Sequence, residues 1–323
     1  MQKTRSNFMN DISKSLMREG FSAGLIEMAE RHPEIVCLGL DISKSVGVDK
    51  FKEVYPDRFF SLGIAEQNAA SIAAGLSLSG KIPVFSTYST FISTRSLDQI
   101  RVSICYNNLH VIIGGAHAGI SVGPDGASHQ ALEDIAIMRS LPNMTVLCPC
   151  DANETKQCFV AAVEQISGPV FIRYAREALP NFTNPVEKIF PGKSKLLKSG
   201  KDIGIIACGS MVYTSLKVSE LLEKYNIYSS VLNLYSIKPI DKEAIINLAK
   251  ITNKIITLEE HQISGGIGSA VSEVLSQNFP VKIKILGIKD TFGESGTPQE
   301  LLFKYNLNEI SIFNSIQKFL NEN

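Results

Sequence analysis

The residues best suited to chemistry lie in one glycine-rich stretch, residues 114–130. It holds His117 and His129, two of the chain's five histidines, with Asp125 between them. Imidazole and carboxylate groups this close in sequence could bind the hydroxyl groups of a polyhydroxylated substrate and transfer protons. Five glycines allow the stretch to adopt the unusual backbone angles of a binding loop. A lone histidine in a loop is usually only solvated, but this grouping favours binding or catalysis.

Glu66 is a second candidate, because it stands in a segment of small apolar residues, 63–75. The ordinary reason for a carboxylate in the first turn of a helix is the helix dipole, worth about 0.3–1 kcal/mol. A carboxyl group enclosed by apolar side chains can instead share a proton, because burial disfavours its charged form. Tyr88 and Phe91 follow this segment, and core packing is their ordinary role. The residues alone leave these alternatives open.

Several other side chains could hold an anionic group of a substrate. Arg173 and Arg176 stand at the end of an apolar run typical of a strand, 169–174, where a ligand crevice would open. Arg18 lies in a predicted helix, and Ser45 lies in the loop after the first predicted strand. Arginine fits a phosphate or a sulfonate because its planar fork donates two parallel hydrogen bonds. Each residue alone could equally form a surface salt bridge or a helix cap.

Alternating strands and helices must position these residues. Apolar runs typical of buried strands are separated by segments with helical spacing. We predict strands at 34–40, 83–86, 109–114, 144–148 and 169–174, and helices at 13–31, from Glu66 onward, and at 91–105, 130–140 and 153–164. This alternation predicts an α/β fold, a mostly parallel sheet covered by helices on both faces. The candidate residues then follow the strands, at the edge where such sheets bind ligands.

The composition changes at 178–201, where proline, asparagine and lysine become frequent. This change predicts a connection between two successive α/β domains. We expect domains at 1–185 and 201–323, joined by a linker at 186–200. In the second domain, the glycines at 265–268 predict a tight turn, because their spacing differs from that of dinucleotide-binding loops. Glu259-Glu260-His261 could be metal ligands, but a solvated or interface cluster is the commoner explanation. We expect the second domain to hold subunits together.

The composition excludes several classes of function. Lysine plus arginine equals aspartate plus glutamate, 32 against 32, so no net charge favours nucleic acid or an anionic membrane. Neither a membrane span nor a signal peptide is indicated. The six cysteines are scattered, and Cys148-Pro149-Cys150 lacks the second ligand pair of a zinc site. We therefore expect a reduced, cytoplasmic protein.

A series of short motifs, all in one order, resembles the C-terminal half of transketolase. The resemblance runs from about residue 15 to the end of the chain. Its strongest matches are Phe59-Phe-Ser-Leu-Gly-Ile-Ala-Glu-Gln-Asn68, Ser86-Thr-Tyr-Ser-Thr-Phe91, Asp98-Gln-Ile-Arg101, Ala116-His-Ala-Gly-Ile-Ser-Val-Gly-Pro-Asp-Gly-Ala-Ser-His-Gln130 and Leu141-Pro-Asn-Met144. In many bacteria and archaea that half is a separate chain, the second subunit of a split transketolase. The resemblance makes 1–185 a pyrimidine-binding domain and 201–323 a transketolase C-terminal domain.

The resemblance also implies a role for each candidate. Glu66 matches the glutamate that shares a proton with the aminopyrimidine ring of thiamine diphosphate, Phe91 the aromatic that stacks on that ring, and Tyr88 a second aromatic nearby. The residues that match sugar-binding groups are His117 and His129, which also transfer protons, Asp125, which reads the donor hydroxyl next to the carbonyl, and Arg18, Ser45 and Arg176, which hold the terminal phosphate.

One family motif is missing from the sequence. Thiamine diphosphate enzymes bind the diphosphate and its Mg²⁺ through Gly-Asp-Gly and a later asparagine, and no Gly-Asp-Gly occurs in this chain. The resemblance therefore implies that this chain supplies no metal ligands and that an N-terminal transketolase subunit carries the diphosphate and Mg²⁺ site. The expected assembly is an α2β2 heterotetramer with the cofactor between unlike chains.

The predicted reaction is transfer of a two-carbon ketol unit from a ketose to an aldose. One alternative is the β subunit of a 2-oxoacid dehydrogenase E1 component, which would not need hydroxyl-reading residues such as His117 and Asp125. Deoxyxylulose-phosphate synthase is a second, but it carries both halves on one chain. A scaffold subunit with a decayed site is the third, although Glu66 and Phe91 are intact. The donor and acceptor sugars stay open, because a phosphate and a sulfonate would suit the same cations.

Overall fold

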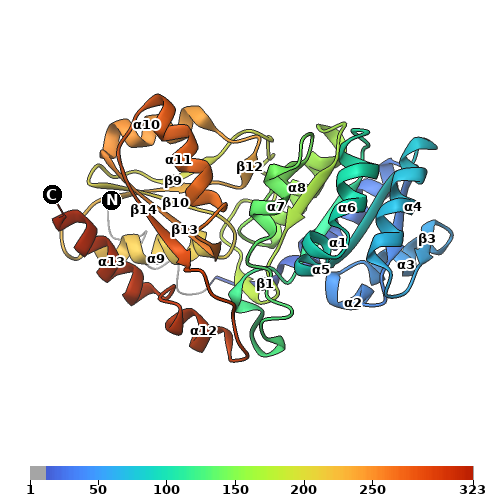
Figure 1. The fold of residues 1–323 in the computed structure, drawn as a ribbon, viewed down its shortest axis with the longest axis horizontal. Coiled ribbons are helices and arrows are strands. Elements are labelled where there is room, and N and C mark those ends of the chain that lie inside the picture. Colours follow the sequence, from blue (N-terminus) through green and yellow to red (C-terminus); the bar gives the residue numbers. More distant parts are fainter. Residues whose placement is uncertain (1–11, 323) are drawn as a thin grey trace.

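The computed structural model describes residues 12–322, and within them the chain forms two large sheets that lie side by side (Figure 1). The first sheet has the strand order β12-β6-β7-β5-β4-β2-β3. Its strands are β2 (Ile35–Gly39), β3 (Phe59–Ser61), β4 (Ile82–Tyr88), β5 (Ile112–Ala116), β6 (Thr145–Leu147), β7 (Val170–Arg173) and β12 (Ser236–Lys238). The pairs are parallel except that of β12 with β6. The α/β fold predicted from the sequence is confirmed.

Helices cover both faces of the first sheet. On one face, α1 (Met17–Arg31) packs against α8 (Ala152–Glu164). Two glycines of α1 permit this close approach: a Cβ at Gly20 would lie 2.0 Å from the carbonyl oxygen of Ala152, and one at Gly24 would lie 2.8 Å from Cβ of Phe159. On the other face, the buried alanines of α4 (Glu66–Leu78) pack against apolar side chains of β4 and β5.

The second sheet has the strand order β14-β13-β10-β11-β9. Its strands are β9 (Lys195–Lys198), β10 (Ile203–Ala207), β11 (Ser229–Asn233), β13 (Lys254–Gln262) and β14 (Lys282–Ile288), and only β9 pairs antiparallel among them. The covering helices are α9 (Met211–Glu223) and α13 (Glu309–Asn321) on one face and α10 (Lys242–Thr252) and α11 (Ile267–Asn278) on the other. A short helix, α12 (Pro298–Lys304), extends below the junction of the two sheets (Figure 1).

The two halves of the chain interlock. Strand β12 comes from the second half but completes the first sheet, and the predicted linker 186–200 contains β9 of the second sheet. One continuous apolar core runs from Met138 and Val146 in the first half to Cys208 and Ile237 in the second. The predicted domain bounds begin at residue 1, and residues 1–11 lie outside the described part of the chain.

Two predicted helices differ from the structure. The helix predicted at 13–31 begins only at Met17, because β1 (Lys14–Leu16) pairs antiparallel with β8 (Ala178–Pro180). The helix predicted at 91–105 is divided into α5 (Ser89–Thr94), α6 (Leu97–Gln99) and a π-helical turn, η2 (Ile100–Cys105). Helical spacing of apolar residues predicted both segments but carried no information on a distant strand partner or on a local break.

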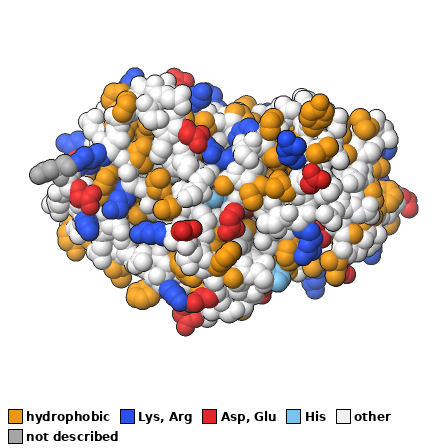
Figure 2. Space-filling model, in the orientation of Figure 1, with side chains coloured by type: hydrophobic (Ala, Val, Ile, Leu, Met, Phe, Trp, Pro, Cys, Tyr) orange, Lys and Arg blue, Asp and Glu red, His pale blue; other side chains and the backbone are white. Residues whose placement is uncertain are grey.

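The face of the molecule shown in Figure 2 carries no large patch of one charge. Lysine and arginine side chains are interspersed with aspartate and glutamate on that face. Within residues 12–322, no helix has both the length and the apolar character needed to cross a bilayer.

Candidate active site

Glu66 opens helix α4, and only 4% of the residue is exposed. Its carboxylate accepts two hydrogen bonds from Nη1 of Arg95, at 2.9 and 3.0 Å. Arg95 follows the end of α5, its side chain is 45% exposed, and its guanidinium lies 4.4 Å from the ring centre of Phe91. The carboxylate is thus buried, as the resemblance to transketolase implies, but its immediate partner is a cation instead of an apolar wall.

Four rings form a continuous cluster beside this ion pair. Tyr88, at the end of β4, stacks on His117 with ring centres 4.3 Å apart, and Phe91 lies 5.8 Å from Tyr88. The ring of His129 approaches both aromatic side chains edge-on, at 5.6 Å from Tyr88 and 5.3 Å from Phe91. The structure therefore brings together four residues that the sequence analysis selected from separate motifs.

His117 is the most unusual member of the cluster. It adopts a positive φ of 54° and is 4% exposed, and neither ring nitrogen has a hydrogen-bond partner. Burial, and next the positive charge of Arg176, lower the pKa of this imidazole to about 4, whereas the backbone of Ser45 and the carboxylate of Asp125 act in the opposite direction. Two buried polar atoms without partners are costly, so they mark a place where a ligand would supply the missing bonds.

The predicted anion-binding residues lie around His117. Arg176 Nη1 lies 3.4 Å from a carboxylate oxygen of Asp125 and donates a hydrogen bond to the carbonyl oxygen of Val122 at 2.5 Å. The charge of Arg18 also acts on His117, so this arginine and the Ser45 backbone belong to the same neighbourhood. The guanidinium of Arg176 retains donors that these contacts do not use.

Arg173 is not free to bind an anion, and this expectation is wrong. It is 5% exposed, its Nε donates to Asp134 at 2.8 Å, and its Nη2 donates to the carbonyl oxygens of Ala131 and Glu260. Burial would lower the pKa of the guanidinium, but the adjacent Asp134 carboxylate outweighs burial and raises it. The side chain of Arg173 points into the junction between the two sheets instead of into a crevice.

The cluster at 259–261 is not solvated. Glu259, Glu260 and His261 are at most 3% exposed and lie at the junction of the two halves. Glu259 accepts hydrogen bonds from the first two backbone N–H groups of α11, those of Ile267 and Gly268. Burial raises the pKa of Glu259 to about 7. The solvated alternative is therefore wrong, because the cluster is buried where the two halves of the chain meet.

Two functional candidates escaped the sequence analysis. Arg95 stands four residues after Phe91, a spacing that places both on one helix face, but a cation at a helix end is common for dipole reasons alone. Glu260 accepts a hydrogen bond from the backbone N–H of Ser121, inside the loop of the two histidines, at 2.8 Å. No local pattern relates residues 139 positions apart.

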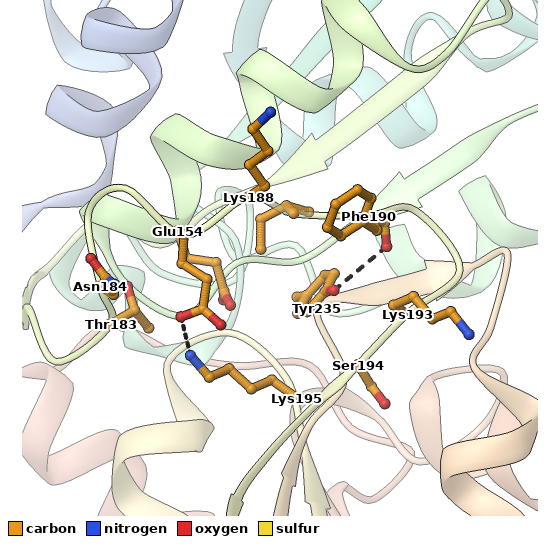
Figure 3. A pocket seen from close by; sticks show the side chains of 11 residues that line it. Glu154, Thr183, Asn184, Lys188, Phe190, Lys193, Ser194, Lys195 and Tyr235 are labelled. Carbon is orange, nitrogen blue, oxygen red and sulfur yellow. Dashed lines mark hydrogen bonds and ion pairs between the residues drawn. The ribbon is translucent and has the colours of Figure 1, made fainter.

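A cavity of about 480 Å³ lies elsewhere, between the 183–195 segment and Tyr235 (Figure 3). Lys195 pairs with Glu187, and the hydroxyl group of Tyr235 donates to the carbonyl oxygen of Phe190 at 3.5 Å. Burial raises the pKa of Glu154, in the wall, to about 7. No candidate residue lines this cavity.

The site suits a flat ring with a polar edge more than a metal ion. No group of three or more His, Cys, Asp or Glu side chains within residues 12–322 is arranged to bind a metal. Glu66 can still accept a further hydrogen bond, because a carboxylate offers about four lone-pair sites and Arg95 occupies two. The ring of Phe91 lies 4.4 Å from the guanidinium of Arg95 that binds this carboxylate, and Tyr88 lies 5.8 Å from Phe91. A pyrimidine ring fits this donor and acceptor set.

Comparison with known families gives two matches that together span most of the chain. The transketolase pyrimidine-binding domain matches residues 13–181, and the transketolase C-terminal domain matches residues 192–312. A solved structure described as a split-gene transketolase, inactive beta4 tetramer, is similar with a TM-score of 0.88 and 44% identity, over 94% of this chain and 98% of that one.

Individual relatives agree with these matches. A transketolase C-terminal section from Methanocaldococcus jannaschii is 41% identical over 94% of this chain and 95% of its own length. One subunit of the apulose-4-phosphate transketolase of Phocaeicola vulgatus is 37% identical (94% and 97%), and the 6-deoxy-6-sulfo-D-fructose transketolase subunit of a Clostridium species is 35% identical (90% and 90%). The chain also resembles 1-deoxy-D-xylulose-5-phosphate synthase of Microcystis aeruginosa at 39% identity, but it spans only 44% of that protein.

Proposed function

The chain belongs to the transketolase family, and on this premise we propose that it supplies the pyrimidine-binding and sugar-binding residues of a two-chain transketolase. The reaction is transfer of a two-carbon ketol unit from a ketose phosphate to an aldose phosphate. The observation that carries the proposal is the buried His117, whose two unpartnered nitrogens lie in one ring cluster with Tyr88, Phe91 and His129. A hydroxyl group both donates and accepts hydrogen bonds, so a sugar could satisfy both nitrogens.

The cofactor that the family implies is thiamine diphosphate, which when bound supplies a nucleophilic carbon and accepts the electron pair of the broken C–C bond. Glu66 would accept and return a proton at the edge of the pyrimidine ring. Phe91 would pack on the face of that ring, and Tyr88 supports Phe91 through their 5.8 Å contact. Arg95 holds the Glu66 carboxylate in place through two hydrogen bonds. These residues exclude water from one side of the reacting centre.

The sugar is bound by the loop residues. Because its pKa is about 4, His117 is neutral at physiological pH, so one ring nitrogen donates to a hydroxyl group and the other accepts. His129 transfers a proton to or from the substrate oxygen, and Asp125 accepts a hydrogen bond from the hydroxyl next to the carbonyl. Arg176, with Arg18 and Ser45, holds the terminal anion. We favour a phosphate, although the relatives' names include a sulfonated and a phosphorylated sugar.

A second chain completes the site in this proposal. The sequence has no Gly-Asp-Gly, so the diphosphate and Mg²⁺ belong to an N-terminal subunit, and we propose an α2β2 assembly in the cytoplasm. The similar beta4 tetramer is described as inactive, which supports the need for another chain. The six buried free cysteines suit a reducing compartment.

The test compares the chain alone with the chain mixed with the transketolase subunit that carries Gly-Asp-Gly. Calorimetry with Mg²⁺ measures binding of thiamine diphosphate, and product analysis measures ketol transfer from xylulose 5-phosphate to ribose 5-phosphate. We expect binding and turnover only in the mixture. Tight cofactor binding by this chain alone would contradict the division of the site. Decarboxylation of a 2-oxoacid by a mixture that transfers no ketol unit would favour the E1 β-subunit alternative.

A further inference from the structure

We propose that the C-terminal half of the chain is a functional part of the sugar site, because it fixes the shape of the 117–130 loop through Glu260 and Gln130. The expected change in sugar kinetics rests on the proposed function, whereas the expected effect on the conformation of the loop does not. Glu260 and Gln130 are positioning residues: they touch the loop backbone and act on the substrate only through His117, Asp125 and His129.

The loop has little internal regular structure to hold it. Its only regular element is a 3₁₀ segment, η3 (Ile120–Asp125), interrupted by a non-helical Gly123. Gly119, Gly123 and Gly126 all adopt positive φ values, 92°, 83° and 74°. A chain with such backbone angles needs external contacts to keep one conformation, because glycine has many alternatives in the absence of restraint.

Glu260 supplies the first contact. Its carboxylate, 3% exposed, accepts a hydrogen bond from the backbone N–H of Ser121 at 2.8 Å and another from the hydroxyl group of Ser210. The approach is so close that a Cβ at Gly119 would lie 2.6 Å from a Glu260 oxygen. The backbone carbonyl of Glu260 also accepts from Arg173 at 2.9 Å, which anchors this residue to the first sheet.

Gln130 supplies the second contact, at the other end of the loop. Its Nε2 donates to the carbonyl oxygen of Glu294, in the segment before α12, at 2.9 Å, and also to that of Ile120 at 3.2 Å. The residue is 3% exposed, and a Cβ at Gly293 would lie 1.8 Å from its Oε1. One amide therefore ties both the start and the end of the loop to the C-terminal half.

Packing closes the space between these two contacts. A Cβ on Gly126 would lie 2.7 Å from the hydroxyl oxygen of Ser295, and one on Gly123 would lie 3.2 Å from Cδ of Pro298. Ile120 is fully buried within the apolar core of the second sheet. The loop that carries Asp125 and His129 thus packs against the C-terminal half of the chain.

Loss of the Glu260 contact should therefore affect sugar binding and cofactor binding differently. Glu260 contacts the backbone of the sugar-facing loop but neither Glu66 nor Phe91, so we expect a change at Glu260 to alter sugar kinetics and not cofactor affinity. A displacement of about 1 Å in a binding group can cost as much as about a hundredfold in rate. We expect Glu260→Ala, in the mixture with the partner chain, to raise KM for the ketose and to lower kcat/KM about tenfold to a hundredfold.

Two matched variants separate positioning from general destabilisation. Glu260→Gln retains an acceptor for Ser121 N–H and can donate to the Ser210 hydroxyl, so it should restore kcat/KM. Glu259→Ala removes the adjacent buried carboxylate, which binds the start of α11 and lies 3.9 Å from the His261 ring but does not contact the loop, so it should lower Tm and leave KM unchanged. Calorimetry should give the same thiamine diphosphate affinity for all three mixtures.

Hydrogen exchange on the chain alone tests the contact without any assay of function. The Ser121 amide should exchange at least about tenfold faster in Glu260→Ala than in Glu259→Ala, because only the first variant loses its acceptor. If Glu260→Ala does not fold, Gln130→Leu tests the second contact: it removes the bonds to the carbonyl oxygens of Ile120 and Glu294, so amides of the 119–130 loop should exchange faster and kcat/KM should fall. If the wild-type mixture transfers no ketol unit, the proposed function fails, and exchange at Ser121 still decides this inference.

Normal exchange and normal kcat/KM in a folded Glu260→Ala chain would overturn the inference. So would an equal rise of KM in Glu259→Ala, since that result would assign the effect to loss of stability alone. A Glu260→Gln chain as impaired as Glu260→Ala would overturn the hydrogen-bond argument.

Discussion

The carboxyl ends of the strands serve different purposes in the two sheets. In the first sheet, β4 ends in Tyr88 and β5 is followed by His117, which has two buried nitrogens without partners. In the second sheet, β13 carries Glu259 and Glu260 near its carboxyl end, and these are also buried, but their oxygens accept hydrogen bonds from the chain itself. The same α/β architecture therefore leaves buried ring nitrogens without hydrogen-bond partners in the first half, whereas the buried carboxylates of the second half have partners within the chain.

The two buried glutamates at helix starts make the contrast concrete. Glu259 binds backbone N–H groups of α11 and has no exposed surface, so it stabilises the fold and can do little else. Glu66 opens α4, but its partner is the half-exposed side chain of Arg95. A partly exposed side chain such as Arg95 can change its conformation when a ligand binds, whereas the backbone N–H groups of a helix are fixed. Burial of a carboxylate is thus a poor guide to function unless its partners are known.

Replacement of Glu66 should have the largest effect. In the two-chain mixture, Glu66→Ala should lower kcat for ketol transfer by about 10²–10⁴-fold, the usual contribution of a proton-transfer group. The matched Glu259→Ala chain should retain kcat once folded, because it lies outside the site. If the two variants lost kcat to a similar extent at an equal folded fraction, measured by circular dichroism, then Glu66 would have no special role compared with Glu259.

The two arginines near the end of β7 should differ in stability. Arg173→Met leaves Asp134 buried without its cation, so the free energy of unfolding in urea should fall by about 3–5 kcal/mol. Arg176→Met breaks a pair in which both side chains are 31% exposed, so the loss should stay below about 1 kcal/mol. Equal losses would mean that Arg176 is also a structural residue.

The two regions should respond oppositely to pH. The pKa of His117 is lowered from 6.5 to about 4, so the unfolded chain takes up this proton first, and stability falls as the pH drops through that window. The pKa of Glu259 is raised from 4.5 to about 7, so the unfolded chain releases this proton first, and stability falls as the pH rises between those values. Each shift corresponds to about 3 kcal/mol in full.

Urea unfolding at a series of pH values would measure these contributions. Relative to the wild type, His117→Asn should lose less stability on acidification, and Glu259→Gln should lose less stability as the pH rises toward 7. Parallel profiles for all three proteins would show that neither group titrates differently in the folded and unfolded chains.

Arg176 should have the smallest of these effects, on substrate binding. Arg176→Met should raise KM for a phosphorylated ketose by about tenfold or more, because a hydrogen bond to a charged group is worth about 1.5–3 kcal/mol. An unphosphorylated ketose serves as the control, and its KM should not change. A rise for both sugars would assign Arg176 to the shape of the loop, through its bond to Val122, instead of to the anion.

The sequence was a good guide wherever a local pattern carries the information. The buried strands predicted at 34–40 and 169–174 correspond to β2 and β7, and the helix predicted at 153–164 corresponds to α8, because continuous apolar runs and helical spacing follow directly from burial. For Tyr88 and Phe91, the residue types alone favoured core packing, and only the resemblance to transketolase implied that they share a site with His117 and His129; in the structure the four rings lie together.

What the sequence could not provide are contacts between distant segments. Strands β1 and β12 have three residues each and pair with strands far along the chain, so no periodicity marks them. The pairing of Arg95 with Glu66 and that of Glu260 with the Ser121 backbone depend on the same long-range arrangement. Arg173 was misassigned for this reason: its type suits an anion, but its neighbour is Asp134.

The position of β12 has a consequence for how the chain acquires its shape during synthesis. The outer edge of β6 is covered only when residues 236–238 are available, long after the other strands of that sheet have been made. Until then the nascent sheet presents an open row of backbone donors and acceptors, the kind of edge that recruits strands from other chains. A fragment that ends within residues 186–200 lacks β12, so the edge of β6 would stay unpaired and we expect the fragment to aggregate. The boundary that looks natural for dissecting the chain is therefore a poor place to cut it.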